Sequence, residues 1–129
     1  MGAWGPGSFE NDDAMDWLGG LTPDSGDAAL RPALVAVAEG RGYVEGPDCS
    51  VAIAAAEAVA AARGKPAAKL PPEVEAWLAS GPHIARDLVD VARKAIRRVV
   101  SDSELKDLWE ESESSEEWRE AMSDLESRL

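Results

Sequence analysis

Hydrophobic residues along most of the chain recur at spacings of three and four, which is the period of an α-helix. Residues 83–100 show this most cleanly, because their apolar side chains fall on one arc of a helical projection and their charged side chains on the opposite arc. Alternation of the kind found in strands covers no more than a few residues around Tyr43. The pattern therefore predicts an all-α protein.

Glycine, proline and capping residues divide this pattern into about six or seven predicted helices. The first follows Ser8, a candidate N-cap, and ends at Gly19-Gly20. Further helices are predicted over residues 30–38, 49–63, 72–80 and 83–100, and Ser/Glu capping boxes at 101–104 and 114–117 predict the last two. No long linker interrupts the chain, so we expect a single compact helical domain over residues 1–129.

Residues 49–63 make the most unusual of these helices. Eight of them are alanine, and Val51, Ile53 and Val59 fall on different sides. A helix that is apolar all round is normally surrounded by others, so we expect this Ala-rich helix at the centre of the bundle. Asp48 is its predicted N-cap.

Glu57 is the only charged residue between Asp48 and Arg63, on a helix otherwise suited to burial. A buried carboxylate must pair, accept hydrogen bonds or become protonated. We expect either a salt bridge to an arginine, with the helix of residues 86–98 as its candidate source, or a position where the helix meets a crevice.

The net charge of -12 is unevenly distributed. Residues 1–48 hold 9 acids and 2 bases, residues 49–100 hold 5 acids and 8 bases, and residues 101–129 hold 11 acids and 3 bases. Such acidity disfavours binding to nucleic acids or anionic membranes and suits a basic protein partner. Two interpretations follow: either the acidic ends pair with the basic middle, or an acidic face stays unpaired and binds something cationic.

The sequence contains few residues that could take part in catalysis. Its single histidine, His83, is predicted to cap a helix or lie on the surface, and no motif places a nucleophile near it. Cys49 is expected to be a small buried residue, with a reactive thiol at a helix N-terminus as the alternative. No catalytic residue and no cofactor is predicted. One cysteine and no signal-peptide pattern favour a cytoplasmic location, and the apolar run 51–62 is too short to span a bilayer.

Acidic and aromatic residues near the start of the chain offer the remaining candidates. Asp12 and Asp16 share a helix face and could contribute to a Ca²⁺ or Mg²⁺ site, although capping also explains acids at a helix start. The glycine-rich opening is expected to lay the indole of Trp4 on the core. All five tryptophans lie beside helical stripes, so we expect core positions, with one or two in a ligand groove as the alternative.

Several stretches resemble one known family. They are residues 3–17 (A-W-G-x-G-x-F-x-N-D-x-A-x-D-W), 52–57 (A-I-A-A-A-E), 62–66 (A-R-G-x-P), Leu70-Pro71 ahead of Val74 and Trp77, and 103–109 (S-E-L-x-x-L-W) with Trp118 and Leu125. Together they span nearly the whole chain and resemble domain-of-unknown-function family 4259. The resemblance implies a small bacterial protein without an assigned activity, and it marks Asn11, Asp12, Asp16 and Glu57 as positions to mutate.

Two hypotheses about function remain. The first is a non-catalytic interaction module that binds a basic protein, as immunity proteins do, an analogy of size and charge only. The alternative is a small-ligand or divalent-metal site where the Trp4 loop meets Asp12, Asp16 and Glu57. The orientation of these carboxylates distinguishes the two, because salt-bridged acids favour the first and acids converging in a Trp-lined cavity favour the second.

Overall fold

The computed structural model describes residues 5–129, and in this part of the chain it contains helices and no strands. The elements are α1 (Asp12–Leu18), the 3-10 helix η1 (Gly26–Ala29), α2 (Arg31–Ala38), α3 (Gly46–Ala62), α4 (Pro72–Ala79), α5 (Arg86–Ser101), α6 (Glu104–Glu110) and α7 (Ser115–Arg128). The predicted all-α bundle is therefore confirmed.

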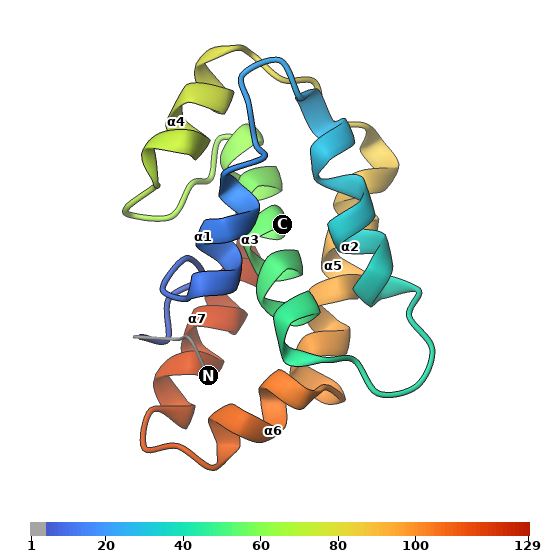
Figure 1. Cartoon of the computed structure of the whole chain (residues 1–129), viewed down its shortest axis with the longest axis vertical. Helices are drawn as coiled ribbons and strands as arrows, with labels where there is room; N and C mark the ends of the chain where they lie inside the picture. Colours follow the sequence, from blue (N-terminus) through green and yellow to red (C-terminus); the bar gives the residue numbers. More distant parts are fainter. Residues whose placement is uncertain (1–4) are drawn as a thin grey trace.

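Helix α3 lies at the centre of the bundle, as its composition predicted (Figure 1). It contacts each of the other six α-helices, and its residues 52–61 are all buried. Pro47 fits its first turn, where no N–H is needed, and Gly64 ends it with a φ of 87°. Because eight of its 17 residues are alanine, with only a methyl group as side chain, the surrounding helices can approach it closely.

Helices α2 and α5 pack against α3 and against each other on one side, while α1 packs on another side (Figure 1). The predicted apolar arc of α5 is confirmed, since Leu88, Ala92, Ile96 and Val99 are fully buried. The helix begins at Arg86 instead of residue 83, because Ala85 is extended and its N–H donates to Asp27 Oδ2 at 2.9 Å. His83 is exposed in the preceding connection.

Several helix starts differ from the predicted caps, because neighbouring polar residues compete for that position. Asn11, not Ser8, caps α1, with its Oδ1 accepting a hydrogen bond from Ala14 N at 2.8 Å. Asp48 lies in the first turn of α3, whose Gly46 N–H donates instead to Glu104 Oε1 at 2.7 Å.

The two predicted capping boxes do not form as boxes. Ser103 caps α6 by accepting from Lys106 N, but Glu104 is directed to the start of α3. Ser114 precedes α7 without a side-chain capping bond. The order and approximate positions of the helices were thus predicted correctly, and several of their starting residues and the polar contacts at their ends were not.

Three of the tryptophans are buried, and their positions confirm a core role. Trp77 is fully buried and donates its indole N–H to the carbonyl of Gly26 at 2.9 Å. Trp109 and Trp118 stack with ring centroids 6.4 Å apart and thereby join α6 to α7. Trp17 is half-buried against the core, and Trp4 lies outside the described residues. Within residues 5–129, no helix has the length and apolar character needed to cross a bilayer.

Candidate functional site

Glu57 and Arg128 form a buried ion pair. The Glu57 residue is 3% exposed. Arg128 donates from Nη1 to Oε1 at 2.7 Å and from Nη2 to Oε2 at 3.1 Å, and the Ser8 hydroxyl donates to Oε2 at 2.7 Å. The hydrogen bonds to Glu57 are the main cause that raises the pKa of Arg128, against the opposing effect of its partial burial. The carboxylate is held by three donors, which is one outcome expected for a charge inside an apolar helix.

The arginine in this pair comes from α7, so the prediction of a partner from residues 86–98 is wrong. Three of the four arginines of α5 are engaged elsewhere, with the carbonyls of Gly40 and Gly42 (Arg98), with Glu126 (Arg97) and with the carbonyl of Leu129 (Arg93). Within α7, Arg128 is anchored from one turn earlier by Asp124, whose Oδ2 lies 2.9 Å from Nε.

A glycine turn positions Ser8 above Glu57. The carboxylate of Glu10 folds back onto this turn and accepts from Gly7 N at 2.9 Å. A Cβ added to Gly5 would lie 2.4 Å from the nearest oxygen of Glu10, and one added to Gly7 would lie 2.3 Å from the other. A side chain at either glycine would therefore displace the flexible end of Glu10 from the turn.

A groove with a volume of about 700 Å³ opens above this ion pair. Its walls come from three segments: residues 7–10 with Met15, the connection 67–72, and α7. The apolar part of the wall consists mainly of Phe9, Met15, Leu70 and Ala121, which are all half-buried and packed against the core. Small-molecule pockets commonly enclose roughly 300–1,000 Å³, so the groove is of ligand size.

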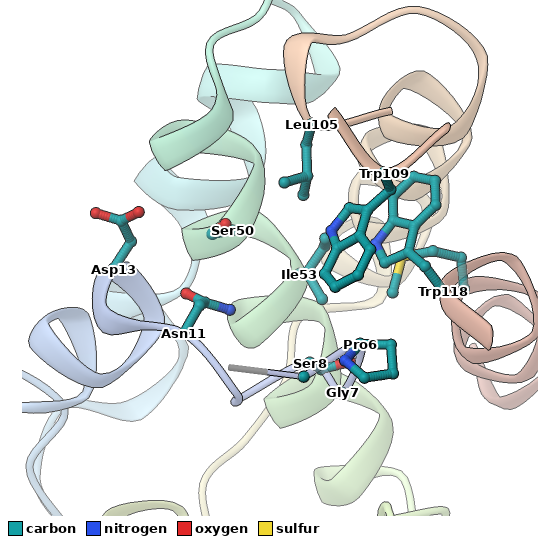
Figure 2. A pocket seen from close by; sticks show the side chains of 12 residues that line it. Pro6, Gly7, Ser8, Asn11, Asp13, Ser50, Ile53, Leu105, Trp109 and Trp118 are labelled. Atoms are coloured by element: carbon teal, nitrogen blue, oxygen red, sulfur yellow. The ribbon is translucent and has the colours of Figure 1, made fainter. Parts of the chain in front are cut away.

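A second hollow lies beside the stacked Trp109 and Trp118 (Figure 2). Asn11, Asp13 and Ser50 contribute polar groups to its lining. Its volume of about 30 Å³ is enough for roughly one or two water molecules and too small for a metabolite. The tryptophans thus line a hollow that does not suit an organic ligand.

Exposed acids gather at the end of the bundle where α6 joins α7. We call this the α6–α7 acidic surface, and it consists of Glu111, Glu113, Glu116, Glu117 and Glu120, all exposed. The ion pairs in this region involve other acids: Glu110 with Lys106 and Arg119, Glu126 with Arg97, and Asp124 with Arg128. Within residues 5–129, no cation lies within ion-pair distance of the five acids.

Comparison with family models gives one match, to the family described as Domain of unknown function (DUF4259), over residues 2–121. The chain belongs to that family. The resemblance seen in the sequence motifs is therefore confirmed. Comparisons with curated proteins and with solved structures find no match. The matched part of this DUF4259 protein includes Ser8 and Glu57 and ends before Arg128, the residue that neutralises Glu57.

The candidate residues of the sequence are not brought together in one site. In this DUF4259 protein Glu57 lies at the floor of the groove, and Asn11 caps α1 beside the smaller hollow. Asp12 and Asp16 are exposed on α1 and line neither of these two hollows. Trp4 lies outside the described residues. Across the described residues, no group of three or more His, Cys, Asp or Glu side chains could hold a metal ion.

Cys49 is buried and carries a free thiol. Burial raises the pKa of this thiol, although hydrogen bonds to Ser103 and to the backbone of Leu105 partly oppose the effect. A thiol whose pKa is raised is a poor nucleophile at neutral pH, so the alternative of a reactive cysteine has no support from its surroundings.

Sequence reasoning missed the residues that build the groove. Arg128 carried one local signal, because Asp124 precedes it at the spacing that forms helical ion pairs. Phe9 and Leu70 belong to motifs of the family resemblance, but each is an isolated apolar residue in a connection, and only the packing of distant segments brings them to one groove.

Proposed function

We propose that this protein is a non-catalytic interaction module whose α6–α7 acidic surface binds a basic protein partner. The observation that carries the proposal is the contrast between the two sets of acids. Glu57 has its oxygens occupied by Arg128 and Ser8. The five exposed glutamates have no cation within ion-pair distance in the part of the chain that is described.

The position of these acids favours binding over a purely solvating role. Glu111 and Glu113 lie in the turn between α6 and α7, and the other three lie in the first half of α7. The Trp109–Trp118 stack holds these two helices together. Negative charge on a defined surface steers a basic partner during diffusion and can raise the association rate by roughly 10–10³-fold. Most of the benefit of such charge is in association rate and specificity.

The test is capture of a basic partner from a lysate of the source organism at low ionic strength, with identification by mass spectrometry. The diagnostic variant changes the five acids of the α6–α7 acidic surface to glutamine. Its matched control changes five other exposed acids that have no ion pair within residues 5–129, namely Asp12, Asp16, Glu39, Glu45 and Glu75. Both variants carry the same net charge.

We expect the unmodified protein and the control to retain a basic protein and the diagnostic variant to lose it. Equal loss from both variants would show that only total charge matters and would overturn the assignment to this surface. Retention of no basic protein at low ionic strength would overturn the proposed function itself.

A further inference from the structure

We infer that the 700 Å³ groove receives a short extended segment of the partner that combines apolar side chains with a basic one. This inference deepens the proposed function and rests on it. It adds a second contact, formed by apolar burial, to the charge-driven contact at the α6–α7 acidic surface.

The walls of the groove are suited to apolar side chains. Phe9, Met15, Leu70 and Ala121 each pack one side against the core and remain half-buried, with the groove beside them. Because the core holds these side chains in place, an occupant would gain contact area without having to order them first.

The polar groups of the groove favour an occupant that carries hydrogen-bond donors. Arg128 already donates to Glu57, to Asp124 and to the carbonyl of Lys65. The second oxygens of Asp124 (Oδ1) and Glu10 (Oε2), by contrast, accept no hydrogen bond from residues 5–129. The lining carries three carboxylates against Arg128 and the exposed Lys69, so its charge is negative. Lysine and arginine side chains supply donors and no acceptors, and therefore match it.

Helix α7 connects the groove to the acidic surface. Glu117, Ala121, Asp124 and Arg128 follow one another at spacings of four, three and four, so they lie on one face of the helix. Glu117 belongs to the α6–α7 acidic surface, and the other three line the groove. At ~1.5 Å per residue, this face is ~16 Å long. About five residues of extended chain cover that length.

The experiment titrates the ¹⁵N-labelled full chain with three synthetic hexapeptides and follows the backbone amide shifts. One peptide alternates arginine and leucine, one alternates arginine and serine, and one alternates glutamate and leucine. The groove is blocked by Ala68→Trp, where Ala68 is an exposed residue of its lining. The matched control is Ala79→Trp, at an exposed position of α4 outside the lining.

We expect the arginine–leucine peptide to shift the amides of residues 67–70 and 121–124 and to bind at least about tenfold more weakly to Ala68→Trp, a change of about 1.4 kcal/mol. The Ala79→Trp control should leave its affinity unchanged. The arginine–serine peptide should shift mainly residues 111–120. Equal binding of all three peptides, or no effect of Ala68→Trp, would overturn the inference.

Two results separate this inference from the proposed function. If the arginine peptides shift only residues 111–120, the groove inference fails and the acidic surface keeps its role. If the arginine–leucine peptide shifts the groove and neither arginine peptide shifts residues 111–120, the groove inference survives and the acidic-surface proposal fails.

Discussion

Glu57 shows how a single charge is tolerated inside an otherwise apolar helix. Removing an ion from water is costly, and a buried pair repays that cost only when its geometry is good and its remaining hydrogen-bonding positions are filled. The bidentate hydrogen bonds from Arg128 and the third hydrogen bond from Ser8 meet these conditions. We therefore infer that Glu57 has a structural role, in which it joins α3 to α7 and to the opening segment.

Removing only the arginine should destabilise the protein. Arg128→Met leaves the Glu57 carboxylate buried without its counterion, so we expect a loss of about 3 kcal/mol in the free energy of unfolding. The double variant Glu57→Leu with Arg128→Met removes both charges and should recover most of that loss. Urea denaturation monitored by tryptophan fluorescence measures both values, and an Arg128→Met variant as stable as the unmodified protein would contradict this role.

Tyr43 offers a direct spectroscopic test, because it is the only tyrosine of the chain. Its hydroxyl donates to Asp107 Oδ2 at 2.6 Å, and this bond is the main cause that raises its pKa to about 12. Absorbance at the phenolate band should therefore show a midpoint near that value, with the helical signal monitored in parallel. Asp107→Ala should return the midpoint toward about 10, the ordinary value for tyrosine.

The raised pKa of Tyr43 also makes the stability of the folded protein depend on pH. The phenol is neutral below its pKa, so the stabilisation from the Tyr43–Asp107 bond is fully present below the unfolded value of about 10. It is lost as the pH rises through the folded value of about 12. A phenolate midpoint unchanged by Asp107→Ala would contradict the assignment of this bond.

At the scale of the helices, α3 depends on small side chains. Ala58 is fully buried in its middle, so Ala58→Leu has no space for the added methyl groups. We expect it to lower the free energy of unfolding by about 1–3 kcal/mol through overpacking. Ala76→Leu, at an exposed position of α4, should change it by less than about 0.5 kcal/mol. Thermal or urea unfolding compares the two, and equal effects would contradict the central position of α3.

The helices could be predicted from the sequence because their signals are local. The apolar arc of α5 and the all-round apolar α3 each follow from spacing alone, and both were predicted correctly. The start of α1 could not be chosen, because Ser8 and Asn11 are both good caps and only the tertiary contact to Glu57 decides between them. The predicted source of the arginine that pairs with Glu57 was wrong for a similar reason. Several arginines were available, and the sequence does not show which other contacts they make.

At the scale of the whole molecule, part of the charge is paired between distant segments. Arg31 binds Asp87 through two bonds of 2.9 and 3.0 Å, and this contact lowers the pKa of Asp87. Arg97 pairs with Glu126 across α5 and α7. The interpretation that the acidic ends pair with the basic middle is thus correct for Arg97 and Glu126. In the Arg31–Asp87 pair the base comes from the acidic end and the acid from the basic middle, and the interpretation does not extend to the α6–α7 acidic surface.

The central claim is that this surface, and not the net charge of -12 in general, binds the partner. The most direct test measures the association rate constant of the captured basic protein at about 20 mM and about 500 mM NaCl, since salt screens charges over a distance that shrinks as its concentration rises. We expect the association rate constant to be roughly tenfold or more lower at the higher salt concentration for the unmodified protein. The same is expected for the control variant, which is altered at Asp12, Asp16, Glu39, Glu45 and Glu75. The variant altered at the five acids of the α6–α7 acidic surface should associate slowly at both salt concentrations. If the two variants behave alike, the surface has no special role and the claim is wrong.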